Sequence, residues 1–341
     1  MPKDDILLLS GGEVASLLSG REIEIIRTVK LAYEAHWRNN SALPHSTFLR
    51  FPDDERNRII ALPAYLGEGF AVAGVKWISS FPGNVGAGVD RASAIIALNS
   101  VVDGRPEAIL EGSIISAKRT AASAALAAGL ISDEKVITKL GLIGLGLINY
   151  EIARFILATL RAVNSFIVYD LDASRARQFA RKCRDEFGDI DVTIAPDVET
   201  VLRNSPMISL ATTAVKPHIH DCSMCSPGTV LLHVSLRDLA PEVILSGDNI
   251  VDDIDHVCRA QTSVHLAEQL TGNRSFIRCA LGDILAGNEA GRRDDDSIVV
   301  FSPFGLGILD LAVSALARTL ARELGLGVTI PSFFPQSWMN R

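Results

Sequence analysis

The sequence predicts an α/β protein in which a doubly wound parallel sheet is joined to a second, discontinuous α+β domain. Over residues 139–301, short apolar runs alternate with helical patterns, which is typical of a parallel sheet covered by helices. Over residues 47–99, runs of Val, Ile and Ala are broken by Gly and Pro, and this pattern is typical of an antiparallel sheet. Two sheets of different kinds in 341 residues indicate two domains with separate cores.

The first domain is expected to begin with a short strand at residues 6–9 and two helices. Ser10 can cap the first helix, and Gly20 precedes the second, whose apolar side chains recur at helical spacing. Strands are then expected at residues 58–63, 71–79 and 93–98. The glycine-rich stretch 82–88 between two of these strands is either a plain hairpin connection or a substrate loop.

An alanine-rich helix over residues 116–128 is expected to connect the two domains. The strands of the parallel sheet are expected near residues 140–143, 166–169, 191–194, 207–211, 230–234, 250–253 and 298–301. A long amphipathic helix over residues 308–324 precedes a tail, residues 331–338, that should pack back on the first domain. The first domain then comprises residues 1–124 and 310–341, and the parallel-sheet domain residues 125–309.

The composition is that of an ordinary globular protein, with 48% hydrophobic and 21% charged residues. A formal net charge of −7 and scattered basic residues argue against a nucleic-acid surface. No stretch approaches the roughly 18 uninterrupted apolar residues of a membrane span. The first residues lack the basic-then-apolar pattern of a signal peptide, so we expect a cytoplasmic protein that does not bind membranes.

Five cysteines fit reduced thiols better than a disulfide framework. His218, His220, Cys222 and Cys225 lie within eight residues, and one interpretation of this cluster is a closed zinc site. Because no second CxxC pair follows, we favour a loop beside a strand and expect no metal.

A strand–turn–helix pattern at residues 139–154 predicts a dinucleotide site. Gly144 and Gly146 allow the backbone to turn sharply and to approach a pyrophosphate, whose charge the first N–H groups of the next helix stabilise. Asn149 stands where the fingerprint has Gly or Ala, so the match is partial. Asp170 ends the following strand, where an adenosine ribose needs a hydrogen-bond acceptor.

The Asp170 carboxylate would repel a 2′-phosphate and therefore favours NAD over NADP, although Arg175 and Arg177 leave NADP open. Ligands of a doubly wound sheet lie at the carboxyl ends of its strands. Thr212 and Thr213 follow one such strand and are suited to line the cofactor site.

Asp238 follows the next strand, and two interpretations of it stay open. Its carboxylate can activate water or carry a proton beside the cofactor. Equally, Asp238 can cap a helix that begins near Pro241.

Four cations of the first half of the chain are candidates for binding anions. Lys76 lies in an apolar strand, where it is either an exposed-face residue or a buried cation with a lowered pKa that binds a substrate carboxylate. Arg50 and Arg91 offer guanidinium groups that match carboxylates. Arg119, at the start of the alanine-rich helix, is placed to reach a pyrophosphate.

Over nearly its whole length the chain resembles the ornithine cyclodeaminase/mu-crystallin superfamily. The resemblance rests on the glycine turn and on residues 47–50 (TFLR), 74–77 (GVKW), 119–123 (RTAAS) and 302–310 (SPFGLGILD). Within the superfamily, the chain is most similar to the dehydrogenases that form 2,3-diaminopropionate for siderophores, through residues 75–78 (VKWI), 90–93 (DRAS), 235–238 (SLRD) and 291–298 (GRRDDDSI). Residues 236–242 (LRDLAPE) lack the Gly-Lys pair of the cyclodeaminases, which puts ornithine cyclisation in doubt.

The resemblance implies a Rossmann domain joined to a substrate-binding and dimerisation domain, NAD as cofactor, and a homodimer. It places Asp238 on the catalytic acid/base and Lys76 and Arg50 on substrate-carboxylate ligands. We count Lys76 among the catalytic residues as well, and Arg91 is our own addition to the substrate site. The cofactor contacts that it implies fall on Ser93, Arg119, Leu147, Ile148, Asp170, Thr212 and Ser302. From the residue pattern we add Gly144, Gly146, Asn149 and Thr213 as further cofactor contacts.

The implied reaction is an NAD-dependent oxidative hydrolysis of N-(1-amino-1-carboxy-2-ethyl)-glutamate to 2,3-diaminopropionate and 2-oxoglutarate, for siderophore or peptide-antibiotic synthesis. Three alternatives stay open: an ornithine cyclodeaminase, a ketimine reductase or alanine-type dehydrogenase, and a small-ligand binding protein like mu-crystallin.

Overall fold

The computed structural model describes residues 5–132, 137–335 and 338–340. The chain forms two compact units: Met1–Arg119 with Leu306–Arg341, and Thr120–Gly305. The first boundary lies inside helix α3 (Ser113–Ile131) and the second lies just before helix α11 (Gly307–Leu324). The boundaries expected from the sequence lie a few residues further along the same two helices.

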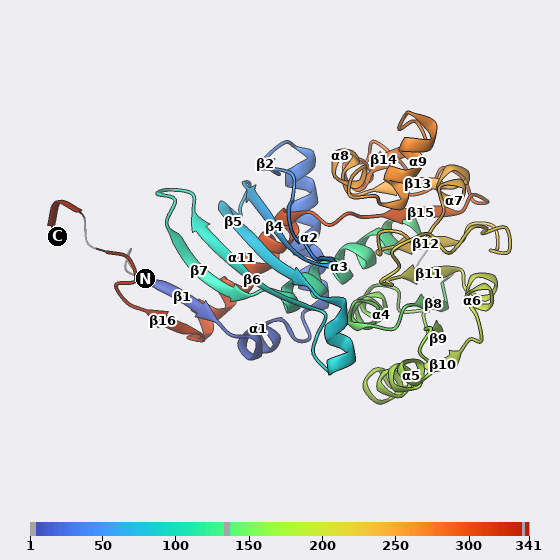
Figure 1. Ribbon diagram of the computed structural model, residues 1–341, viewed down its shortest axis with the longest axis horizontal. Coiled ribbons are helices and arrows are strands. Elements are labelled where there is room, and N and C mark those ends of the chain that lie inside the picture. The colour runs from blue at the N-terminus through green and yellow to red at the C-terminus, as the bar shows by residue number, and fades with distance from the viewer. Residues whose placement is uncertain (1–4, 133–136, 336–337, 341) are drawn as a thin grey trace. The chain divides into compact units, whose positions relative to one another are not determined.

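The first unit is built on an eight-stranded sheet of order β16-β1-β7-β6-β5-β4-β2, with β3 paired to β4 (Figure 1). All of its pairs are antiparallel except β1 with β7. Its strands are β1 (Ile6–Leu9), β2 (Ser41–Ala42), β3 (Thr47–Phe51), β4 (Asp54–Leu66), β5 (Val72–Ser80), β6 (Ala92–Ser100), β7 (Pro106–Glu111) and β16 (Val328–Ile330). The predicted largely antiparallel sheet is therefore present.

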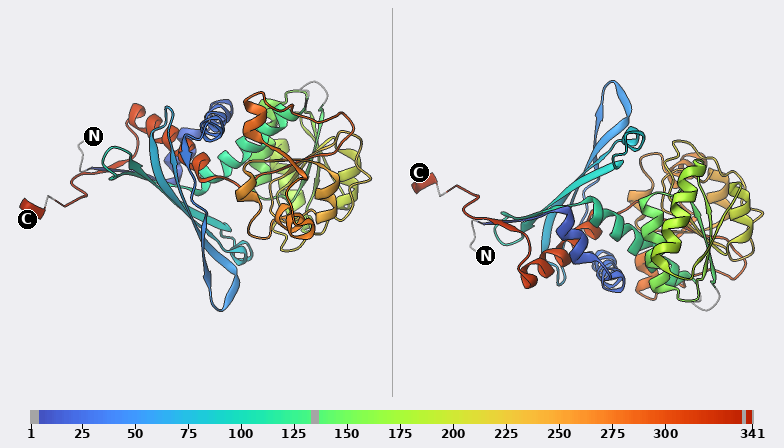
Figure 2. Two further views of the ribbon diagram at one scale, coloured as in Figure 1. Left: turned by 90° about the horizontal axis from the view of Figure 1, so that it is seen from above. Right: turned by 90° about the horizontal axis from the view of Figure 1, so that it is seen from below.

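Helices cover one face of this sheet (Figure 2). They are α1 (Gly11–Leu18), α2 (Glu22–Trp37) and α11, and α11 packs on β4, β5 and β6. Gly74 on β5 has no room for a side chain, because a Cβ there would lie 2.2 Å from the Ala97 carbonyl oxygen of β6 and 3.1 Å from the Leu311 side chain of α11. Ser10 caps α1 as predicted, in a capping box with Glu13.

The opposite face of the sheet carries exposed apolar side chains. Strand register puts Leu49, Ala61, Trp77 and Ile95 on this face, and Leu49, Trp77 and Ile95 are 40–50% exposed. Residues 82–88, which we expected to be a loop, include a 3₁₀ helix, η1 (Pro82–Ala87). β16, which pairs with β1, directly precedes the expected tail, residues 331–338. In the tail, Ser332 N donates to Asp5 Oδ1 at 3.2 Å, residues 336–337 lie outside the described residues, and the short η2 (Trp338–Asn340) begins at its last residue.

The second unit is a doubly wound parallel sheet, as predicted, with the order β10-β9-β8-β11-β12-β15-β13-β14. Its strands are β8 (Lys139–Ile143), β9 (Ser165–Tyr169), β10 (Asp191–Ile194), β11 (Met207–Leu210), β12 (Val230–His233), β13 (Asp248–Val251), β14 (Ile277–Ala280) and β15 (Val299–Ser302). Its own helices are α4 (Leu147–Thr159), α5 (Ala173–Phe187), α6 (Val198–Asn204), α7 (Pro241–Ser246), α8 (Ile254–Val257), α9 (Ser263–Thr271) and α10 (Leu281–Leu285). The sequence analysis missed β14, whose four residues include Arg278 between apolar neighbours.

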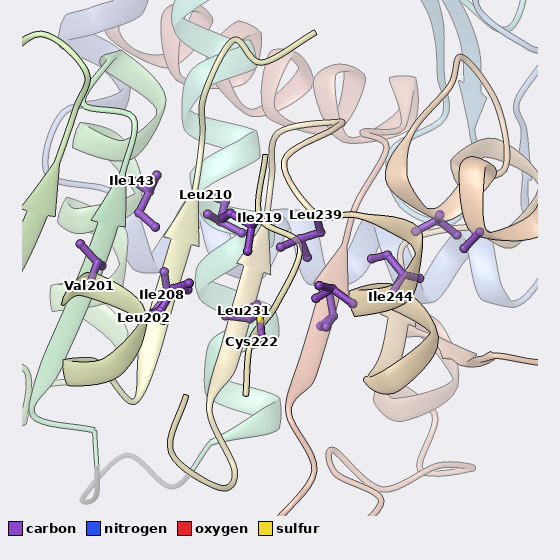
Figure 3. Packing of buried hydrophobic residues seen from close by; sticks show 14 of the residues in the cluster. Ile143, Val201, Leu202, Ile208, Leu210, Ile219, Cys222, Leu231, Leu239 and Ile244 are labelled. Atoms are coloured by element: carbon purple, nitrogen blue, oxygen red, sulfur yellow. The ribbon is translucent and has the colours of Figure 1, made fainter. Parts of the chain in front are cut away.

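Buried aliphatic side chains fill the space between this sheet and its helices. Figure 3 shows Ile143, Ile208 and Leu231 from the strands beside Val201 and Leu202 from α6. Four of these five side chains are no more than 1% exposed. Close packing of these side chains limits the movement of the strand ends and so fixes the positions of the polar residues that follow each strand.

One helix, α3, is long and apolar enough to cross a membrane by length and composition. Of its most apolar window, 78% is buried inside the protein, and Ala121, Ala122, Ala124 and Ala125 are fully buried. A buried core helix of a globular protein meets the same criterion, so this observation gives little support to a membrane span.

Candidate functional site

The polar residues of the second unit gather at the carboxyl ends of neighbouring strands. The chain runs from β8 through β9 to β10 in one direction and then from β11 to β12 in the other, so the order reverses between β8 and β11. Gly144 follows β8, and Thr212 follows β11 after a single residue, so the two flank this reversal. Doubly wound sheets bind ligands at such a switch point.

The turn after β8 has the backbone that a dinucleotide pyrophosphate requires. Gly144 has a φ of +83°, and a Cβ there would lie 2.7 Å from the Ala211 carbonyl oxygen. Gly146 is the N-cap of the thirteen-residue helix α4, with open space where a Cβ would stand. Within the described part of the chain, the backbone N–H groups of Leu147 and Ile148 have no hydrogen-bond partner and are available to an anion.

The buried side chain of Asn149 holds this turn in place through hydrogen bonds. Its side chain is fully buried, and its Nδ2 donates to the carbonyl oxygens of Ile143 and Gly144 at 2.9 and 2.8 Å. Ser209 on β11 donates its hydroxyl to Asn149 Oδ1 at 2.7 Å. These bonds make Asn149 a positioning residue that joins the turn to β11, and the contact with the cofactor that we expected of it stays a prediction.

Asp170 lies at the end of β9 with a side chain only 8% exposed. Its Oδ2 accepts a hydrogen bond of 2.8 Å from Leu145 N in the glycine turn, and its Oδ1 accepts one of 2.9 Å from Asp172 N. Each carboxylate oxygen keeps a second lone pair, so the group can still accept from a ribose hydroxyl. Arg175 lies 3.8 Å from Asp170, so a cation adjoins the expected ribose acceptor and NADP stays open.

Asp238 lies at the centre of a hydrogen-bonded cluster beyond β12. Its carboxylate is fully buried and accepts hydrogen bonds from the hydroxyls of Thr212 and Ser235. His218 Nε2 lies 3.0 Å from Asp238 Oδ1. Burial alone would raise the pKa of the Asp238 carboxyl, but hydrogen bonds from neighbouring side chains, His218 first among them, outweigh burial and hold that pKa below its ordinary value.

This geometry excludes the helix-cap interpretation of Asp238, and a catalytic role for it stays a prediction. Helix α7 has Ala240 as its N-cap and no side-chain cap, so Asp238 does not cap it. The expected cofactor residue Thr212 donates to Asp238 and accepts from Ala214 N at 3.0 Å, while Thr213 is exposed. Contacts of Thr212 and Thr213 with a cofactor stay predictions.

Two histidines complete the cluster, and the sequence analysis assigned neither of them to it. His233 ends β12 and is 2% exposed. Its Nε2 accepts a hydrogen bond of 3.3 Å from Asp238 N. Its Nδ1 lies 3.1 Å from the hydroxyl of Ser302, an expected cofactor contact on β15. His218 was considered only as a metal ligand. Among the residues that the structure describes, no group of three or more His, Cys, Asp or Glu could hold a metal ion.

The first unit contains a separate buried cluster around Asp310 of α11, a residue that the sequence analysis also missed. Lys76 Nζ lies 2.7 Å from Asp310 Oδ2, and Arg119 Nε lies 3.1 Å from Asp310 Oδ1. Asp310 is fully buried, Lys76 is 2% exposed and Arg119 is 9% exposed. Ser116 accepts further hydrogen bonds from Lys76 at 3.1 Å and from Arg119 at 3.4 Å.

The geometry therefore supports the second interpretation of Lys76, a buried cation. Burial lowers its pKa from 10.5 to about 8, although the charge of Asp310 opposes the shift. Two cations share one carboxylate, so the cluster carries a net positive charge that a bound anion would balance. Arg119 was expected among the cofactor contacts, and this contact stays a prediction; the structure groups Arg119 with Lys76.

The remaining predicted residues of the first unit lie on, or directly next to, the sheet that carries Lys76. Strand pairing aligns Arg50 with Arg58 and Arg58 with Ser80, on the face of the sheet that Lys76 occupies. Arg50 is exposed, and Arg91 donates to the Ser80 hydroxyl at 3.1 Å. Ser93 lies on the other face, 2.8 Å from the Ser79 hydroxyl, and its contact with the cofactor stays a prediction.

The chain matches the model of the ornithine cyclodeaminase/mu-crystallin family over residues 19–323. It is 28% identical to the N-((2S)-2-amino-2-carboxyethyl)-L-glutamate dehydrogenase of Staphylococcus aureus, over 88% of this chain and 90% of that protein. A structure of the Thermococcus litoralis Δ1-pyrroline-2-carboxylate reductase with NADH and L-proline superposes with a TM-score of 0.89 at 26% identity, over 95% of this chain and all of that one.

An archaeal alanine dehydrogenase dimer with bound NAD superposes with a TM-score of 0.85 at 25% identity, over 97% of this chain and all of that one. These similarities extend across both units, and the fold that they share is the one predicted from the sequence. The chain belongs to the ornithine cyclodeaminase/mu-crystallin family.

Proposed function

We propose that this chain is an NAD-dependent dehydrogenase that oxidatively hydrolyses N-((2S)-2-amino-2-carboxyethyl)-L-glutamate to 2-oxoglutarate and 2,3-diaminopropionate. The substrate is a secondary amine that links the α-carbon of glutamate to the β-carbon of 2,3-diaminopropionate. Loss of hydride from the glutamate α-carbon and of the amine proton gives a C=N bond. Addition of water and cleavage of the C–N bond then release the two products.

The glycine turn and Asp170 would hold the cofactor. The free N–H groups of Leu147 and Ile148 suit its pyrophosphate, and Asp170 suits its adenosine ribose. When bound, NAD⁺ supplies the acceptor for the hydride. The relatives with NAD or NADH in their structures support this assignment.

The choice of substrate in this proposal rests on the number of cationic side chains in the first unit. Among the described residues, Asp310 is the carboxylate that Lys76 and Arg119 share. Arg50 lies on β3 of the sheet that carries Lys76, and Arg91 directly precedes β6 and donates to Ser80 of β5. The proposed substrate carries three carboxylates, whereas alanine and proline carry one each. Guanidinium groups bind carboxylates through paired hydrogen bonds, so several of them favour a substrate with several carboxylates.

We place the acid–base chemistry of the hydrolysis in the Asp238 cluster, since a buried carboxylate with hydrogen-bonded histidines can hold and move a proton. The reaction would take place in the cytoplasm, and the diamine product would serve siderophore or peptide-antibiotic synthesis. The exposed apolar face of the first sheet, with Trp77 and Ile95, supports a homodimer, as does the dimeric alanine dehydrogenase.

A comparison of substrates tests this proposal. Purified protein and NAD⁺ are incubated separately with the conjugate, L-alanine, L-proline and L-ornithine, while NADH is followed by absorbance and ammonia is assayed. We expect kcat/KM for the conjugate to exceed that for each other amino acid by at least a hundredfold. Ammonia and proline from ornithine without net NADH would instead identify a cyclodeaminase, and NADH from alanine alone an alanine dehydrogenase.

A further inference from the structure

We propose that His218 is the catalytic group that carries the proton during hydrolysis, and that Asp238 is the positioning residue that orients it. This inference rests on the proposed function, because it concerns the step in which water cleaves the C–N bond. The geometry that points to it is the contact of 3.0 Å between His218 Nε2 and Asp238 Oδ1.

The contact determines which ring nitrogen of His218 is free. An ionised carboxylate can only accept hydrogen bonds, so Nε2 must carry the proton that it donates to Asp238. In the neutral ring, Nδ1 then keeps a lone pair and is the base. Within the described residues, Nδ1 of His218 makes no hydrogen bond, and the side chain is 38% exposed. A reacting water can therefore reach it.

Asp238 itself is poorly suited to take a proton from water. Its side chain is fully buried, and its oxygens already accept from Thr212, Ser235 and His218. Because these bonds keep its pKa below the ordinary value, it remains a carboxylate at neutral pH. It can stabilise a positive charge on His218, as the buried carboxylate of a serine-protease triad does for its histidine.

His233 cannot replace His218 in this role. Its Nε2 accepts the N–H of Asp238 at 3.3 Å, and its Nδ1 lies 3.1 Å from the Ser302 hydroxyl, so both ring nitrogens are engaged. It is also 2% exposed. The buried histidine thus supports the Asp238 backbone, and the exposed histidine faces solvent.

The backbone holds the His218–Asp238 pair together independently of the side chains. His218 N and Ile219 N both donate to the Asp238 carbonyl oxygen, at 3.0 and 2.9 Å, and Ala240 N donates to the Ile219 carbonyl oxygen at 2.9 Å. These bonds fix the two segments side by side, which is the preorganisation that proton transfer needs.

One histidine can take and return every proton that moves during the hydrolysis. As the water oxygen bonds to the imine carbon, His218 Nδ1 takes a proton from the water, and the C=N bond becomes a C–N single bond. His218 returns this proton to the nitrogen, which gives a carbinolamine. His218 Nδ1 then takes the hydroxyl proton of the carbinolamine and delivers it to the nitrogen as the C–N bond breaks, leaving 2-oxoglutarate and the amine. His218 is unchanged at the end, and no further oxidant is used.

The test uses the full-length protein with His218 replaced by Gln or by Ala. Gln can still donate to Asp238 but cannot carry a proton, so a merely structural role would survive His218→Gln and a catalytic role would not. His220→Gln is the matched control, because His220 is exposed and only two residues away. Rapid mixing with the conjugate and NAD⁺ separates the first NADH formed from the steady-state rate.

We expect both His218 variants to form the first equivalent of NADH at the wild-type rate and then to turn over about 10²–10⁴ times more slowly. The His220→Gln variant should behave as wild type. A steady-state rate of His218→Gln within threefold of wild type would overturn the inference. A His218 variant that forms no first equivalent of NADH and does not turn over would overturn it as well.

The two proposals fail in different ways. NADH formation from the conjugate with unchanged His218→Gln turnover rejects the role of His218 alone. Absence of NADH from the conjugate rejects the proposed substrate, and the same variants are then measured with L-alanine, whose imine must also be hydrolysed. A wild-type protein that oxidises only L-proline, whose cyclic imine needs no hydrolysis, would overturn both.

Discussion

Replacement of Lys76 by Met is predicted to weaken substrate binding without the loss of stability that a broken buried ion pair normally causes. Met has a similar length and no charge, so it removes the ammonium and leaves Arg119 paired with Asp310. Removing one partner of a buried salt bridge usually costs about 3–5 kcal/mol. In this cluster, however, Lys76 is the second of two cations on one carboxylate.

The magnitude follows from the pKa of Lys76. It is lowered from 10.5 to about 8, and one pKa unit corresponds to about 1.4 kcal/mol, so the buried charge costs the folded protein about 3 kcal/mol at neutral pH. This figure already includes the opposing attraction of Asp310. Met removes the buried charge, and Asp310 keeps its charged hydrogen bond to Arg119, so we expect the variant to be at least as stable as wild type at pH 7.

Urea denaturation at several pH values measures this directly. The folded pKa of Lys76 lies below the unfolded one, so the unfolded chain binds more protons between pH 8 and 10.5. The wild-type free energy of unfolding should therefore gain about 3 kcal/mol relative to the Lys76→Met variant as the pH rises through this window. Other titrating groups are common to both proteins and cancel in the difference.

Activity provides the second readout. Lys76→Met should raise the KM for the conjugate at least tenfold, since a charged hydrogen bond to a carboxylate is worth about 1.4 kcal/mol or more. A variant that lost more than about 3 kcal/mol at pH 7 while keeping its wild-type KM would refute the reasoning, because Lys76 would then be a purely structural cation.

Three further perturbations test the other parts of the site. Gly144→Ala should lower the free energy of unfolding by about 1–3 kcal/mol, because φ is +83° and the Cβ would lie 2.7 Å from a carbonyl oxygen. Gly146→Ala should keep its wild-type stability in denaturation assays and weaken only NAD⁺ binding in titrations. Asp170→Ser should lower kcat/KM for NAD⁺ at least tenfold and raise it for NADP⁺; unchanged selectivity would exclude Asp170 from the ribose site. Trp77→Glu, on the exposed face of β5, should convert a dimer to monomers in sedimentation analysis, and an unaltered mass would place the interface elsewhere.

The sequence was sufficient for features that depend on local patterns. The alternation of strands and helices predicted the parallel sheet, and the spacing typical of dinucleotide sites pointed to Gly144, Gly146 and Asp170, whose cofactor contacts stay predictions. Lys76 was recognised because a charge in an apolar strand is costly unless it is paired.

The partners of these residues depend on tertiary contacts and could not be derived in the same way. Asp310 lies 234 positions from Lys76, and only the packing of α11 on β5 brings them together. His218 appeared to belong with His220 and two cysteines because these residues are neighbours in the chain, yet the parallel bridge between Ile219 and Leu239 places it against Asp238. One signal was available for Asp310: it is a lone acidic residue in an apolar helical segment.

The transfer of a labelled hydrogen tests the central claim most directly. The conjugate is prepared with deuterium at the glutamate α-carbon and incubated with the protein and NAD⁺. We predict one deuterium in each NADH formed, with 2-oxoglutarate and 2,3-diaminopropionate in equal amounts and no free ammonia. Unlabelled NADH, or ammonia in place of the diamine, would show that another bond is oxidised and would contradict the account.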